Sequence, residues 1–120
     1  YAGATSGVAV PKRVYVRSRK LLAAVRQLPC MHTGIHGQTE PAHSNWQQHG
    51  KAGRVKADDN RVAALCRRVH TELDQGSHLS EQERKTLWWN AHVKTVEALL
   101  ARGLWPDSVP VPQLVDFDRP

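Results

Sequence analysis

The sequence predicts a small α+β domain in which a two-stranded hairpin lies between helices. Two short runs with strand character, residues 39 to 44 and 61 to 66, are separated by a long polar loop rich in Gly, Lys and Arg. Helical periodicity with N-terminal capping residues precedes the first run and follows the second. A chain of 120 residues has room for one domain of this kind.

The amino-terminal part is expected to be an arm followed by a helix. Residues 1 to 16 lack helical period and run into the basic stretch PKRVYVRSRK, so a flexible arm is predicted there. The arm lacks the layout of a secretory signal, and because it starts with Tyr1 rather than Met we expect a fragment or a processed chain. Ser18 is expected to cap the helix, which Pro29 ends. Its apolar side carries Leu21, Leu22, Val25 and Leu28.

Two further helices follow the second predicted strand. Residues 67 to 75 are expected to form a short helix that ends at Gly76. Ser80 and Glu83 have the spacing of a capping box, which opens a long helix through about Arg102, with Gly103 after it. The predicted core stripe of this helix comprises Trp89, Val93, Val96 and Leu100, widened by Leu87, Trp88 and Leu99. Residues 105 to 120 form a Pro-rich extended tail that either packs across the domain or hangs free.

The net charge of +6 is unevenly distributed along the chain. Residues 1 to 68 carry twelve Lys and Arg side chains against three acidic ones, whereas the rest of the chain is acidic on balance. This asymmetry indicates either a polyanion partner, most simply DNA, or a basic face kept for solubility. No run of eighteen apolar residues exists, so we expect no membrane span and a cytoplasmic location.

The segment ALCRRVHTELDQG, residues 64 to 76, carries a candidate for chemistry. His70 and Asp74 are four residues apart in the predicted helix, so their side chains share one face. Such a pair either binds a metal ion or forms an ordinary surface ion pair.

The order of the motifs resembles that of the HNH endonucleases, the ββα-metal class, and in particular its small phage and prophage members. The matching pieces are LPCMHTG, PAHSNW, HGKAGRVKADD and LCRRVHTELDQG, within residues 20 to 105. The resemblance implies a nuclease domain over residues 17 to 104, with a ββα-metal core between an N-terminal helix and a long C-terminal helix. It implies metal-dependent hydrolysis of DNA, with phage or host recombination proteins as further partners.

The resemblance also assigns roles to individual residues. His43 in PAHSNW would be the general base that takes a proton from the attacking water. His70 would bind the divalent ion, with Asp74 as a second ligand or a support for His70. His49 in the loop is the leading substitute for a metal ligand that the residue before His43 does not supply. The expected ion is Mg²⁺ or Mn²⁺, with Zn²⁺ or Ni²⁺ as alternatives. Asp59 falls near the family's middle Asn position, which holds the loop and the base in place.

Two features of this assignment depart from the family or stay open. Asp58 or Asn60 could take the role of Asp59, and Ala42 stands where many members have an acidic residue or His. The side chains expected to contact DNA are Lys51, Arg54, Lys56, Arg67 and Arg68.

Related sequences carry two Cys pairs that close a structural zinc site, whereas this chain keeps only Cys30 and Cys66. We therefore expect the zinc to be lost. The two cysteines are then a disulfide or a pair of buried thiols, with a zinc site rebuilt on His32 or His36 as a third alternative.

The sequence leaves two rivals to a nuclease. One is a non-catalytic DNA-binding or recombination accessory module on the same fold, which would bind DNA without a metal. The other is a protein-interaction domain that uses the Pro-rich tail and has no affinity for DNA.

Overall fold

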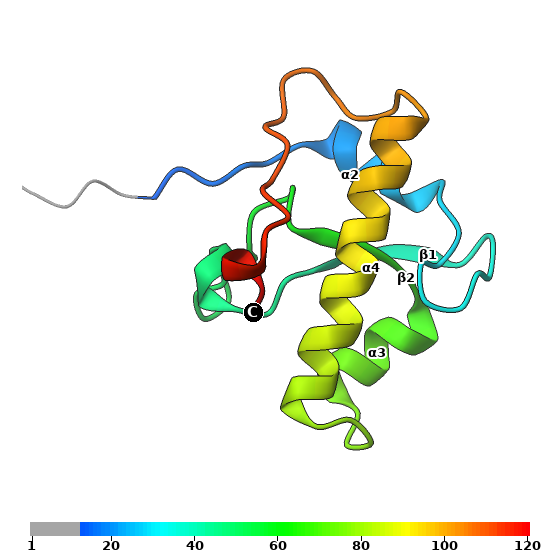
Figure 1. Cartoon of the computed structure of the whole chain (residues 1–120), viewed down its shortest axis with the longest axis vertical. Coiled ribbons are helices and arrows are strands. Elements are labelled where there is room, and N and C mark those ends of the chain that lie inside the picture. Colours follow the sequence, from blue (N-terminus) through cyan, green and yellow to red (C-terminus); the bar gives the residue numbers. More distant parts are fainter. Residues whose placement is uncertain (1–12) are drawn as a thin grey trace, which may run out of the picture.

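The two predicted strands pair as an antiparallel hairpin in the computed structural model, which describes residues 13 to 120. Strand β1 spans Thr39–His43 and strand β2 spans Val62–Cys66, with Thr39 opposite Cys66 and His43 opposite Val62 (Figure 1). Each strand is one residue shorter than predicted, and the predicted α+β class is confirmed. Most of the predicted flexible arm, residues 1 to 12, lies outside the described part of the chain.

The first described helix, α2, spans Arg19–Arg26 and begins where the capping residue predicts. The Ser18 hydroxyl accepts a hydrogen bond from the backbone N–H of Leu21 at 3.1 Å, which satisfies one of the free donors of the first turn. Leu21, Val25 and Leu28 are buried, and they pack with residues of β2 and with Leu99. The N-terminal helix therefore supports the hairpin through its apolar side.

The other two helices are also confirmed. Helix α3, Arg67–Gln75, continues directly from β2, and helix α4, Glu81–Ala101, opens with the complete Ser80–Glu83 capping box. Helix α4 lies across the hairpin, and α3 lies beside its amino-terminal half (Figure 1). Within residues 13 to 120, no helix combines the length and the apolar character needed to cross a lipid bilayer.

The buried face of α4 differs from the predicted stripe at its end. Leu99 is fully buried, whereas Leu100 is 46% exposed, so the placement of Leu100 in the core is wrong. The buried face of α4 differs from the predicted apolar stripe because it also includes two polar residues, His92 and Thr95, whose hydrogen bonds are satisfied. His92 Nδ1 donates to the carbonyl of Val62 at 2.8 Å, and the Thr95 hydroxyl accepts from the N–H of Ala64 at 2.9 Å. These contacts tie the helix to β2.

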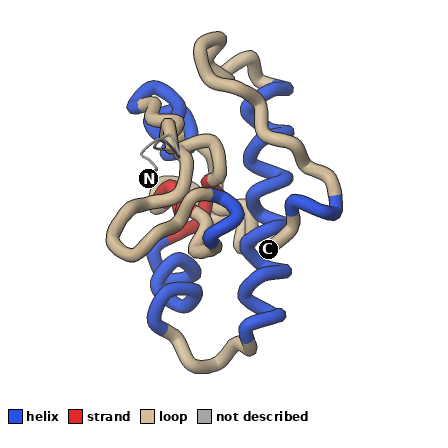
Figure 2. Tube along the Cα trace, turned by 90° about the vertical axis from the view of Figure 1, so that its left-hand side faces the viewer, coloured by secondary structure: helices blue, strands red, loops and turns tan. Residues whose placement is uncertain are grey.

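The chain after α4 turns back along this helix and ends beside the loop between the strands (Figures 1 and 2). Asn60 donates to the carbonyl of Pro110 at 2.9 Å, and Arg61 donates to that of Gln113 at 2.8 Å. The short 3₁₀ helices η1, Gln47–His49, and η2, Asp116–Asp118, meet where this tail ends. The tail therefore packs across the domain rather than hanging free.

Candidate active site

A cavity of about 270 Å³ lies where the hairpin, the loop between its strands and α3 meet. Its walls are formed by Pro41, His43, Ser44, Asn45, Lys51, Lys56, His70 and Asp74. The structure thus brings together the predicted base, two of the predicted metal ligands and two of the predicted phosphate-binding lysines. They come from β1, the loop and α3, which are separate in the sequence.

His43, the last residue of β1, is held from behind by Asp59. Its Nε2 lies 2.8 Å from Asp59 Oδ1. A carboxylate only accepts hydrogen bonds, so Nε2 carries the ring proton and Nδ1 is the nitrogen left to act as a base. Burial lowers the pKa of His43, the Asp59 carboxylate opposes that shift, and the charges of Lys56 and Arg17 reinforce it. The ring is therefore neutral at physiological pH.

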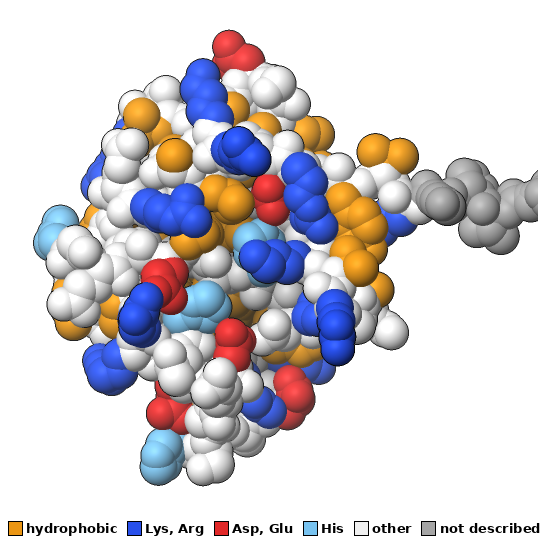
Figure 3. Space-filling view, turned by 180° about the vertical axis from the view of Figure 1, so that it is seen from behind, with side chains coloured by type: hydrophobic (Ala, Val, Ile, Leu, Met, Phe, Trp, Pro, Cys, Tyr) orange, Lys and Arg blue, Asp and Glu red, His pale blue; other side chains and the backbone are white. Residues whose placement is uncertain are grey.

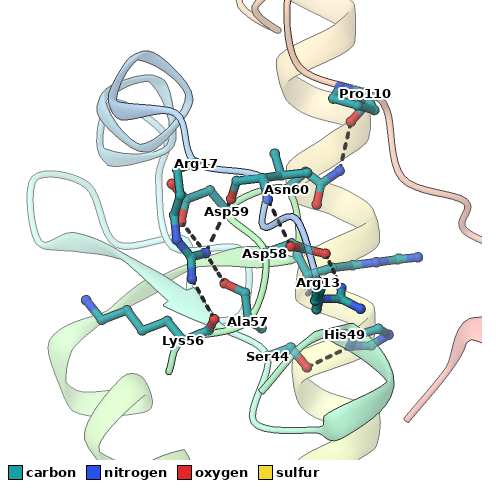
Figure 4. Close-up of polar contacts among 12 residues, drawn as sticks. Arg13, Arg17, Ser44, His49, Lys56, Ala57, Asp58, Asp59, Asn60 and Pro110 are labelled. Carbon is teal, nitrogen blue, oxygen red and sulfur yellow. Dashed lines mark hydrogen bonds and ion pairs between the residues drawn. The ribbon is translucent and has the colours of Figure 1, made fainter. Parts of the chain in front are cut away.

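Of the neighbours Asp58, Asp59 and Asn60, only Asp59 forms a hydrogen bond with the His43 ring. Asp58 and Asn60 turn to other partners (Figure 4). Asp58 pairs with Arg13 and accepts from the backbone of residue 16, and Asn60 is bound to the tail. Asp59 is thus the one of these three residues that is placed to hold the His43 ring.

His70, in the first half of α3, lies between two carboxylates. Its Nδ1 is 2.9 Å from Glu40 Oε1, and its Nε2 is 3.3 Å from Asp74 Oδ2. The hydrogen bond with Asp74, helped by Glu40 and opposed by burial, raises the pKa of His70. The same contact with His70 lowers the pKa of Asp74. The predicted i, i+4 pair therefore forms, and it faces the cavity.

Two residues of this cluster were missed by the sequence-based reasoning. Glu40 in β1 binds both His70 and the guanidinium of Arg67, at 3.0 Å, and these two contacts lower its pKa. Asn45 donates to Asp74 Oδ1 at 3.0 Å. Glu40 had a usable signal, because it is the only acidic residue among the first 57 and lies within a predicted strand. Nothing in the sequence distinguishes Asn45 from other loop residues.

His49 does not take part in the cavity, which disagrees with its expected role as a metal ligand. It is buried, with Nδ1 at 2.6 Å from the Ser44 hydroxyl and Nε2 at 2.7 Å from the carbonyl of Asp118. His49 is therefore not among the side chains that line the cavity. Its ring also packs against Trp88. His49 joins the loop to the tail and to the core.

Ala42, which stands where many HNH sequences have a ligand, is part of the core. Its side chain is buried, and its carbonyl accepts a hydrogen bond from the indole of Trp88 at 2.9 Å. The side chain before His43 therefore lies among apolar residues and away from the cavity.

The predicted DNA contacts divide into two groups. Lys51 and Lys56 line the cavity, whereas Arg54 is exposed in the loop. Arg67 and Arg68 are exposed at the start of α3, where Arg67 is paired with Glu40. On the face shown in Figure 3, Lys and Arg side chains are spread among acidic, His and apolar ones.

Cys30 and Cys66 are free thiols, both buried in one core cluster. No disulfide joins the two, which agrees with the buried-thiol alternative. The N–H of Thr33 donates to the Cys30 sulfur at 3.3 Å. Burial raises the pKa of Cys30, but the hydrogen bonds, those of Thr33 first, outweigh it and lower the pKa to about 7. His32 and His36 are exposed on the surface.

The donor set of the cavity fits a divalent cation that keeps several of its waters. Over residues 13 to 120, no group of three or more His, Cys, Asp or Glu side chains is arranged to hold a metal ion by itself. His70 and Asp74 offer one imidazole and one carboxylate at the cavity wall. The carboxylate with several waters suits Mg²⁺ or Mn²⁺, and the imidazole equally suits a first-row ion such as Zn²⁺ or Ni²⁺.

Comparison with protein-family models, with curated proteins and with solved structures gives no match for this chain.

Proposed function

We propose that this protein is a divalent-metal-dependent endonuclease that hydrolyses phosphodiester bonds in DNA. One observation carries the proposal: a neutral His43 held by Asp59 and the His70–Asp74 pair line the same cavity. The motif order that resembles HNH endonucleases supports the same assignment, with β1, β2 and α3 as the ββα-metal core. A phage or prophage origin is part of the proposal.

In this mechanism His43 acts as the general base. Its Nδ1 takes a proton from the attacking water, because Nε2 already donates its own proton to Asp59. Asp59 keeps the ring in this tautomer and stabilises the imidazolium that forms. The lowered pKa keeps His43 unprotonated, and so ready to act, at neutral pH.

The other side of the cavity would hold the cation and the phosphates. His70 Nε2 and Asp74 would bind the divalent ion. The N–H at Nδ1 of His70 would donate a hydrogen bond to Glu40, and this bond would orient the ring. A bound Mg²⁺ or Mn²⁺ supplies positive charge near the oxygens that become negative during hydrolysis. Lys51 and Lys56 are placed to bind the phosphates that flank the cut.

The proposal is tested by plasmid nicking with Mg²⁺, Mn²⁺, Ni²⁺, Zn²⁺ or EDTA. We expect metal-dependent relaxation of supercoiled DNA that is lost in His43→Ala and in His70→Ala. His78→Ala is the matched control, because His78 is an exposed histidine that does not line the cavity. Equal loss in all three variants would contradict the roles assigned to His43 and His70.

A non-catalytic DNA-binding module is the second candidate, and the two lysines that line the cavity, together with the net charge of +6, support DNA binding in either case. The two functions differ in their need for His43 and for a metal. Absence of cleavage with every metal, together with salt-sensitive DNA binding that is unchanged in His43→Ala, would establish the module and exclude the nuclease.

A further inference from the structure

The segment just before α2 is bound along the loop that carries Asp59 (Figure 4). The backbone N–H of Asp59 donates to the carbonyl of Val16 at 2.8 Å, and the N–H of Val16 donates to Asp58 Oδ1 at 3.0 Å. The N–H of Ser18 donates to Asp59 Oδ2 at 2.7 Å. The loop next to the cavity is thus held by residues that lie far away in the sequence.

Arg17 makes the widest set of contacts in this segment. Its Nη1 donates to the carbonyl of Ala57 at 2.6 Å, and its Nη2 donates to the carbonyl of Lys56 at 2.8 Å. Nη1 also lies 3.5 Å from Asp59 Oδ1. A planar guanidinium can hold two consecutive carbonyls and a carboxylate at once, whereas an ammonium group has no such fork. These contacts define the path of the chain from Lys56 to Asp59.

Both oxygens of the Asp59 carboxylate are thereby engaged. Oδ1 binds His43 and lies near Arg17, and Oδ2 binds the backbone of Ser18. The carboxylate is buried, so a rotation that broke these contacts would leave it without partners. The orientation of the His43 ring consequently depends on the segment before α2.

We propose that Arg17 is a positioning residue for the base: it holds the Lys56–Asp59 loop so that Asp59 keeps His43 with its proton on Nε2. The effect of Arg17 on catalysis rests on the proposed function. Its effect on the His43 ring does not, because the contacts that hold the ring form in the protein without DNA or metal. The alternative roles of Arg17 are a direct phosphate contact, since its side chain is 44% exposed, and a merely electrostatic influence.

The first test measures the His43 ring in the metal-free protein, by ¹⁵N NMR of the imidazole nitrogens. We expect one tautomer, with the proton on Nε2, in the parent protein. Arg17→Ala should give a mixture of tautomers and faster exchange of the Nε2 proton with water. Arg19→Ala is the matched control, because Arg19 is an exposed arginine two residues away whose side chain makes no hydrogen bond within the described residues.

The second test measures the kinetics of plasmid nicking. Arg17→Ala should lower kcat by about 10- to 100-fold with little change in KM, because the base is displaced while the DNA still binds. Arg17→Lys keeps the charge and most of the side chain, so it should fold like the parent. It should nevertheless fail to restore kcat, since it cannot hold both carbonyls.

Three results would overturn the inference. They are an unchanged His43 tautomer in Arg17→Ala, a raised KM at unchanged kcat, and full activity in Arg17→Lys. The NMR measurement does not require DNA cleavage, so it tests the inference even if the protein cuts no DNA. Failure of the proposed nuclease function and failure of this inference can therefore be distinguished.

Discussion

His70 Nδ1 lies 2.9 Å from Glu40 Oε1, so a strand residue sets the orientation of a helix residue at the edge of the cavity. With Nδ1 turned towards Glu40, the other nitrogen, Nε2, is turned towards Asp74. This is the arrangement in which a carboxylate orients a metal-binding imidazole from behind.

Glu40→Ala should weaken metal binding. Loss of the carboxylate frees the His70 ring to rotate, and removal of such a support typically lowers metal affinity by about 10- to 100-fold. The measurement is the dissociation constant for Mn²⁺, from electron paramagnetic resonance of the free ion. Arg67→Ala is the control, because it removes the other partner of Glu40 and leaves His70 in place. Equal affinities in the parent and in Glu40→Ala would contradict the role of Glu40.

Asp59→Ala should lower kcat by about 100-fold, which is the low end of what a general base contributes. The substitution removes the acceptor of the His43 Nε2 proton. Asp59→Asn should be impaired at least as strongly, because an amide has one acceptor oxygen where the carboxylate uses two, so its NH₂ group must face either the N–H of Ser18 or the His43 ring. The measurement is single-turnover nicking at saturating DNA. An Asp59→Asn variant with the activity of the parent would contradict the requirement for a carboxylate behind His43.

The activity should fall in acid as His43 takes up a proton. Because burial lowers the pKa of His43, the midpoint of kcat/KM should lie below the ordinary histidine value of about 6.5. Asp59 raises this pKa, whereas the charges of Lys56 and Arg17 lower it.

Lys56→Gln removes one of those positive charges, so the acid midpoint should move to higher pH. The pH profile of kcat/KM in the two proteins measures this shift. Arg54→Gln is the control, because Arg54 is an exposed loop residue outside the cavity, so its replacement should leave the midpoint in place. A midpoint that moves to lower pH in Lys56→Gln would refute the assignment of the acid limb to His43.

Leu99→Ala and Leu100→Ala should differ sharply in stability. Leu99 is fully buried between α4 and the hairpin, so its truncation should lower the free energy of unfolding by about 2 to 5 kcal/mol. Leu100, its neighbour, is 46% exposed and should lose less than about 1 kcal/mol. Urea unfolding followed by circular dichroism measures both. Similar losses would show that the core face of α4 includes Leu100 after all.

Local chemistry in the sequence determined where the elements begin and end. Ser18, the Ser80–Glu83 capping box and Gly76 act on the backbone within a few residues, so their effects can be read without knowledge of the rest of the fold. The i, i+4 spacing of His70 and Asp74 likewise places both side chains on one helix face.

Only the tertiary structure decided which side chains share the cavity. His49 and His43 are both histidines near a predicted strand end, yet one is buried against Trp88 and the tail while the other faces the cavity. Among Asp58, Asp59 and Asn60, the contact with His43 identifies Asp59 as the residue that holds the ring.

The physical reason is that hydrogen bonds between distant segments have no periodic or local signature. Arg17 reaches the loop of Asp59, and Glu40 reaches His70, only after the core has packed α2 and α3 against the hairpin. The sequence therefore determined the elements and the residue types for the chemistry, and packing determined which of them meet.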